Sequence, residues 1–233
     1  MHSKRTDLSP EQAVYAQDAE SVAGWPKTFN GNIGLADVIG QIDATVLVGL
    51  STVFGAFTEP IVREMARKVG RPIIFPLSNP TSHAEAAAED LIQWTNGKAL
   101  VATGSPFAPV KYGNAEIAIS QCNNVYIFPA VGLGVVASRA LRVTDRMLLA
   151  AAHALAENSP ALHNPSAPLL PVLNDVRRVT AEMAFAIGLA AQQGGVAPKT
   201  TPEELRERVQ RSQWAPQYPP VASLETEQLQ VSR

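Results

Sequence analysis

The chain has 233 residues, of which 46% are hydrophobic and 17% are charged, and its formal net charge is −2. This composition predicts a globular protein of one or two domains, and the small net charge argues against nucleic acid or an anionic membrane as a partner. Its single cysteine, Cys122, excludes an intramolecular disulfide, and the lack of a secretory signal or a membrane-length apolar run favours a cytoplasmic protein.

The first half of the sequence predicts strands that alternate with helices. Apolar strands are expected at 44–49, 72–77 and 100–103. Helices are expected at 10–17, 33–40, 57–69 and from Ser82 to about Trp94. The strand at 44–49 is apolar throughout, as is typical of a parallel strand covered on both faces. The β-α-β-α-β order therefore predicts an α/β fold with a Rossmann-like, doubly wound parallel sheet.

After Asn124 the pattern predicts helices only. They are expected at 125–141, 145–157, 173–193 and after Thr201, which opens a capping box with Glu204. Gly132 and Gly134 lower the stability of the first of these helices unless they permit close packing. We expect a partial Rossmann-like domain at 1–140, an all-helical region packed on it at 141–218 and a loose tail at 219–233.

Side-chain amides follow two of the apolar segments. Asn79 ends the segment 72–79, and Asn123 and Asn124 open the helical region. Amides at the strand ends of an open α/β sheet point to the crevice where such folds bind ligands, and they donate and accept hydrogen bonds without charge. The purely structural alternatives are a turn at Asn79 before Pro80 and a helix cap at Asn123 and Asn124.

A glycine- and serine-containing turn, Gly49-Leu-Ser51, follows the first strand and could approach a cofactor with its backbone. A purely structural turn is an equal alternative, because most α/β proteins have one and no Gly-x-Gly-x-x-Gly sequence is present. The four histidines have no metal-ligand spacing, and Glu85 is expected in the first turns of the helix that begins at Ser82. No catalytic residue and no metal ligand is identified.

Several motifs together resemble the C-terminal half of malic enzyme, of the bacterial NAD-preferring type. They are Leu77-Ser-Asn-Pro-Thr-Ser82, Trp94-Thr-Asn-Gly97, Ala102-Thr-Gly-Ser-Pro-Phe107, Gln121-Cys-Asn-Asn-Val-Tyr-Ile-Phe-Pro129 and Val131-Gly-Leu-Gly-Val-Val-Ala-Ser138. Val46-Leu-Val-Gly-Leu-Ser51, Gly55-Ala-Phe-Thr-Glu59 and Arg142-Val-Thr-Asp145 add to them. The resemblance covers roughly residues 5–218 in the order of the family.

The resemblance implies oxidation of (S)-malate by NAD, or by NADP, and decarboxylation to pyruvate, with Mg²⁺ or Mn²⁺ required in the complete enzyme. It implies substrate contacts by Asn79, Asn123 and Asn124. It also implies cofactor contacts, made by Gly49, Leu50, Ser51, Ser78, Asn79 and Asn123. The complete enzyme is expected to be a homo-oligomer. Thr52 departs from the glycine common in the family, and its Cβ could crowd the cofactor.

The resemblance also implies absences. The family's acid, base and metal ligands, and the first strands of its nucleotide-binding sheet, have no counterpart in this sequence. We expect an incomplete domain that has no turnover by itself and an exposed apolar strand edge. The alternatives are a non-catalytic partner of complete malic-enzyme subunits, or another nucleotide-dependent dehydrogenase with the same sheet.

Overall fold

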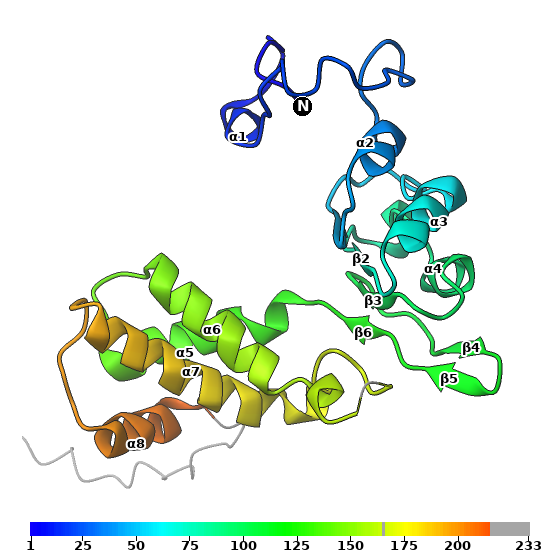
Figure 1. The fold of residues 1–233 in the computed structure, drawn as a ribbon. Helices are drawn as coiled ribbons and strands as arrows, with labels where there is room; N and C mark the ends of the chain where they lie inside the picture. The colour runs from blue at the N-terminus through cyan, green and yellow to red at the C-terminus, as the bar shows by residue number, and fades with distance from the viewer. Residues whose placement is uncertain (165, 215–233) are drawn as a thin grey trace, which may run out of the picture. The chain divides into compact units, whose positions relative to one another are not determined.

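The computed structural model describes residues 1–164 and 166–214, and these form two compact units (Figure 1). The first unit contains residues 1–125 and 155–176. The described part of the second unit contains residues 126–154 and 177–214. The predicted loose tail at 219–233 lies outside the described residues, and the predicted domain boundary at residue 140 stays a prediction.

The first unit is built on a parallel sheet, as the sequence predicted. Its strands run in the order β1-β2-β3-β6, and they comprise β1 (Val46–Gly49), β2 (Ile73–Pro76), β3 (Leu100–Thr103) and β6 (Ser120–Gln121). The sequence pattern did not predict β6 or a small antiparallel hairpin of β4 (Val110–Tyr112) and β5 (Ala115–Ile117). All four strands of the sheet therefore end at one edge.

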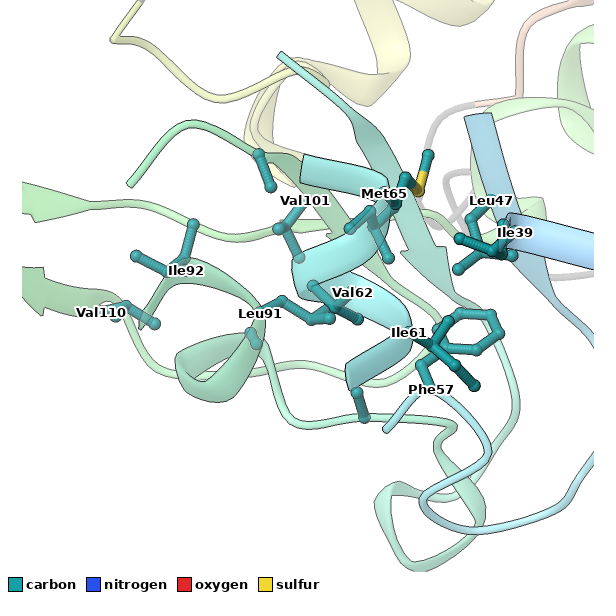
Figure 2. Close-up of a cluster of buried hydrophobic side chains, with 14 residues drawn as sticks. Ile39, Leu47, Phe57, Ile61, Val62, Met65, Leu91, Ile92, Val101 and Val110 are labelled. Carbon is teal, nitrogen blue, oxygen red and sulfur yellow. The ribbon is translucent and has the colours of Figure 1, made fainter. Parts of the chain in front are cut away.

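Helices pack on one face of this sheet. The unit contains α1 (Pro10–Ala13), α2 (Leu35–Gln41), α3 (Glu59–Lys68), α4 (Ala88–Trp94) and the 3₁₀ turns η1 (Thr81–His83), η2 (Asn124–Tyr126, whose last residue falls in the second unit), η3 (Pro160–Leu162) and η4 (Leu173–Asp175). Figure 2 shows Ile61, Val62 and Met65 of α3 gathered with Leu47 of β1 and Leu91 of α4. The spacing of the three α3 residues puts them on one helix face, so their burial anchors α3 to the sheet.

The prediction that the first strand is covered on both faces was wrong. Val46 and Val48 of β1 are 50% and 47% exposed, whereas Leu47 and Gly49 are buried. Successive side chains of a strand point to opposite faces, and only the face of Leu47 packs against the core around α3. β1 also forms an edge of the described sheet, in line with the expected apolar strand edge.

The helix predicted from Ser82 was also placed wrongly. A single 3₁₀ turn at 81–83 is followed by a non-helical segment, and α4 begins only at Ala88. The backbone of this segment is held by a neighbouring loop, because Gly55 N donates to Ala84 O and Phe57 N donates to Glu85 O. These tertiary hydrogen bonds replace the helical ones, so Glu85 lies outside the helix.

The second unit is helical, as predicted. It contains α5 (Phe128–Ser138), α8 (Pro202–Ser212) and most of both α6 (Asp145–Glu157) and α7 (Val176–Gln193). Gly134 permits α5 to approach α7, because a Cβ there would lie 2.8 Å from Ile187 Cγ2. The capping box of Thr201 and Glu204 is confirmed. Leu173, predicted on the long helix stripe, instead lies in η4 of the first unit and is 51% exposed.

Candidate functional site

The turn after β1 begins the candidate site. Ser51 lies at its centre and donates two hydrogen bonds of 2.8 Å, from its backbone N and from Oγ, to Oε1 of Glu85. Thr52 follows with a φ of 57°, a left-handed conformation in which a β-branched residue is an outlier. Glycine adopts this conformation without cost, so Thr52 holds it at the cost of backbone strain.

The turn after β2 is joined to the turn after β1 through Ser78. Its Oγ donates to Glu85 Oε1 at 2.6 Å and accepts from Thr52 N at 2.9 Å. Ser78 is buried, so its hydroxyl is committed to the interior of the two turns. Ser78, which the resemblance implies as a cofactor contact, therefore lies beneath the surface of the turn.

Glu85 carries a negative charge inside this arrangement. Burial alone would raise the pKa of the Glu85 carboxyl, but hydrogen bonds from Ser78 and Ser51 outweigh burial and hold the pKa below its usual value. The side chain is buried, and its partners are hydroxyl and backbone N–H donors. An ionised carboxylate is stable there because the donors replace its lost water.

Asn79 lies beyond Ser78 and is exposed at the edge of the sheet. Its Oδ1 accepts a hydrogen bond from Ser105 Oγ, which joins the turn after β2 to the turn after β3. Gly104 permits this approach, because a Cβ at that position would lie 2.1 Å from Leu77 O. The Nδ2 of Asn79 donates to none of the described residues, so it is free to meet a ligand.

The turn after β6 continues the same edge. Gln121 Nε2 donates to Gly104 O at 3.1 Å, which ties β6 to the turn after β3. Asn123 lies just beyond, exposed, with its Oδ1 accepting from Val125 N at 2.9 Å. Asn124 begins η2 and is also exposed. The helix-capping alternative therefore holds for the oxygen of Asn123, and its amide nitrogen remains available.

Asn79 and Asn123 thus follow β2 and β6, the two strands that flank β3. Strands in a sheet are about 4.8 Å apart, so the two turns begin roughly 10 Å from each other. Both strands run parallel to β3, so both amides belong to the carboxyl edge of the sheet. Their convergence on a common ligand stays a prediction.

An open cavity of about 850 Å³ lies beside the end of β1. Gly49, Leu50 and Ser51 line it, together with the loop at 28–35, whereas Ser78, Asn79 and Asn123 do not. Asp37 shapes that loop by accepting hydrogen bonds from Thr28 N and Oγ1 and from Gly34 N. The bond from Gly34, followed by that from the Thr28 hydroxyl, lowers the pKa of Asp37.

The described residues include no group of three or more histidine, cysteine, aspartate and glutamate side chains that could hold a metal ion. Partial burial raises the pKa of the Cys122 thiol. No helix among residues 1–164 and 166–214 is long and apolar enough to cross a membrane.

Sequence reasoning missed three site residues, namely Glu85, Ser105 and Gln121. Glu85 could have been noticed as the single charge in Ala84-Glu-Ala-Ala-Ala88, because a run of small apolar residues indicates a buried setting. Ser105 and Gln121 carry no such signal. Their roles depend on the pairing of β3 with β6, which a two-residue strand does not reveal.

A parallel sheet whose polar turns gather at the carboxyl edge defines a Rossmann-like α/β protein, a class that binds nucleotides at this edge. The sequence model of one family, described as "Malic enzyme, NAD binding domain", matches residues 1–192. The chain belongs to this family. The expected resemblance is thereby confirmed.

Curated relatives agree with this assignment. The NAD-dependent malic enzyme of Acinetobacter baylyi is 50% identical over 207 residues, and that of Cronobacter sakazakii is 47% identical over 207 residues. Each alignment covers 89% of this chain and 36% of the relative. The chain therefore spans just over a third of the length of these relatives.

Solved structures show the same fold. The malic enzyme of Entamoeba histolytica superposes with a TM-score of 0.67 at 22% identity, covering 91% of this chain and 40% of its own. The malic enzyme of Pyrococcus horikoshii gives a TM-score of 0.60 at 28% identity, covering 78% of this chain and 38% of its own.

Proposed function

We propose that this chain forms the NAD-binding part of an enzyme that oxidises (S)-malate and decarboxylates it to pyruvate and CO₂. Family membership and the names of the curated relatives support this proposal. The observation that carries it is the row of linked turns at the carboxyl ends of β1, β2, β3 and β6. Open α/β sheets bind their ligands at this edge.

Bound NAD would supply the hydride acceptor. Gly49, Leu50 and Ser51 would border it, because they line the cavity beside β1. The Ser51 donors and the Ser78 hydroxyl already bind Glu85. In the proposal these groups keep the turns in shape, and the exposed surface of the turn meets the cofactor.

Asn79 and Asn123 would act as hydrogen-bond donors. In both residues Oδ1 accepts a bond from the protein, from Ser105 Oγ and from Val125 N respectively. Each amide therefore keeps its NH₂ group for another acceptor. Such donors suit acceptor groups, for example a carboxylate of malate or the carboxamide oxygen of nicotinamide. We place Asn124, exposed in the same turn, among the substrate contacts as well.

The metal requirement belongs to the complete enzyme. The resemblance implies Mg²⁺ or Mn²⁺, but the described residues supply no suitable ligand group, so no step is assigned to a metal here. We likewise propose that the complete enzyme is a homo-oligomer. Sedimentation of the complete enzyme would measure its oligomeric state.

Two measurements test the proposal. Isothermal titration of the purified chain with NAD is expected to show saturable binding, and with NADP weaker binding. The chain mixed with (S)-malate, NAD and Mn²⁺ is expected to form no NADH, as the resemblance implies. Absence of NAD binding would contradict the proposed function, and robust NADH formation would contradict the expected lack of turnover.

A non-catalytic partner is the alternative function. It predicts that the chain co-purifies with a complete malic-enzyme subunit and changes the assembly of that subunit without binding NAD itself. A screen of other 2-hydroxy acids in place of malate addresses the second alternative, another dehydrogenase.

A further inference from the structure

We infer that Glu85 is a positioning residue that holds the turns after β1 and β2 in the shape that receives the cofactor. This inference rests on the proposed function, because that function gives the turns their ligand. Glu85 itself would not touch the ligand, since its side chain is buried behind the turns. Its action passes through Ser51, Ser78 and Thr52.

The first support is the number of donors on one carboxylate. Oε1 accepts from Ser51 N and Ser51 Oγ at 2.8 Å each, and from Ser78 Oγ at 2.6 Å. Oε2 accepts a longer bond of 3.4 Å from Ser78 N. Hydrogen bonds to an ionised acceptor are stronger than neutral ones, so this side chain fixes two turns that come from different strands.

The second support is the space reserved for the carboxylate. Gly49 leaves room for it at the end of β1, because a Cβ on Gly49 would lie 2.4 Å from Glu85 Cδ. The backbone of Glu85 is held as well, because Phe57 N donates to Glu85 O at 2.9 Å. Glu85 is thus fixed by its backbone and seated against a glycine.

The third support is the path from Glu85 to Thr52. The Ser78 hydroxyl donates to Glu85, and its oxygen accepts from Thr52 N at 2.9 Å. Thr52 has the left-handed φ of 57° that favours glycine. The hydrogen bonds through Ser78 therefore hold Thr52 in a strained conformation. If these bonds were lost, Thr52 would leave this conformation and the turn would change shape.

The replacement Glu85→Gln tests this role because it keeps the size of the side chain. Glutamine loses the negative charge that strengthens the bonds from Ser51 and Ser78 to Oε1, and an NH₂ group at the position of Oε2 could not accept from Ser78 N. We expect faster hydrogen exchange at the Ser51 and Thr52 amides, by about tenfold or more, and a Kd for NAD raised by a similar factor. The matched control is Glu89→Gln, on the exposed face of α4, which should change neither value.

Adding Thr52→Gly to Glu85→Gln separates positioning from general stability. Glycine adopts a left-handed φ without strain, so the double variant should recover part of the NAD affinity. If Glu85→Gln fails to fold, Ser78→Ala removes one bond of the path and should give a smaller change in the same direction.

Exchange rates and NAD affinity in Glu85→Gln that match the wild type would overturn the inference, as would a double variant with no recovery. If the wild-type chain binds no NAD, the proposed function fails. The exchange rates at Ser51 and Thr52 then still decide whether Glu85 holds the turn.

Discussion

The hydroxyl of Ser105 donates to Oδ1 of Asn79, and this bond leaves the Nδ2 group as the end of the amide without a partner among the described residues. The two residues come from turns that follow different strands. Gly104 lets the turns meet, since any larger residue would strike Leu77 O. The geometry of this pair makes Asn79 a donor toward the ligand in our account.

The donor role of the Asn79 amide gives the first prediction. Asn79→Asp keeps the acceptor for Ser105 but replaces the NH₂ group with a second oxygen and adds a negative charge. We expect the Kd for NAD to rise by about 10- to 100-fold, because a donor is replaced by a group that repels acceptors. Titration calorimetry measures the change. Asn114→Asp, an exposed residue between β4 and β5, adds the same charge away from the carboxyl edge. An unchanged Kd in Asn79→Asp would contradict the assignment of Asn79 as a hydrogen-bond donor to the ligand.

The backbone of Thr52 gives the second prediction. Thr52→Gly should raise the free energy of unfolding by about 1 kcal/mol, because a left-handed conformation costs about 1–2 kcal/mol for residues with a Cβ and little for glycine. The midpoint of urea denaturation measures this gain. A lower midpoint would show that the bond from Thr52 Oγ1 to Ser51 O matters more than the strain.

Lys68 gives the third prediction. Its Nζ donates to the carbonyl oxygens of Ile39, Gly40 and Ile42, which end α2. Lys68→Met should lower the free energy of unfolding by about 1–3 kcal/mol, because the carbonyls lose a charged donor. Lys98→Met, at an exposed position, is the control. Equal denaturation midpoints for the two variants would argue against a capping role.

Two glycines of α5 give the fourth prediction. A Cβ at Gly132 meets nothing within 4 Å, so Gly132→Ala should stabilise the helix by about 0.8–1 kcal/mol. A Cβ at Gly134 would lie 2.8 Å from Ile187 Cγ2, so Gly134→Ala should destabilise the second unit by about 1–3 kcal/mol. Thermal unfolding compares the two. The same sign for both substitutions would contradict the close approach of α5 and α7.

The pH dependence of stability gives the fifth prediction. The pKa of Glu85 is lowered in the folded state from its ordinary value of 4.5, so its contribution to stability is complete above that pH. It is lost as the pH falls through the lower folded pKa. The difference in stability between wild type and Glu85→Gln should therefore be largest near neutral pH and shrink in acid. Denaturation at a series of pH values measures it, and a difference that grows in acid would contradict the assignment.

The sequence predicts the parallel β1–β3 core well, because apolar strands and amphipathic helices carry strong periodic signals. It fails where tertiary contacts decide. The segment at 84–87 has helix-forming alanines, yet hydrogen bonds to the loop at 55–57 keep it out of a helix. The coverage of β1 could not be read either, since an apolar strand does not reveal which of its faces is packed.

The site was predictable in part. Asn79 and Asn123 stand out as amides at segment ends, and both lie exposed at the carboxyl edge of the sheet. The link from Glu85 to Thr52 was not predictable, because it joins residues far apart in the sequence through the hydroxyl of Ser78. Such a path depends on side-chain directions that only the folded turns define.

The most direct test is to map NAD binding on the chain by nuclear magnetic resonance. NAD is expected to shift the resonances of the backbone amides of Leu50, Ser51 and Thr52 and of the side-chain amide of Asn79. Shifts confined to the hairpin of β4 and β5, or to the helices of the second unit, would contradict this expectation.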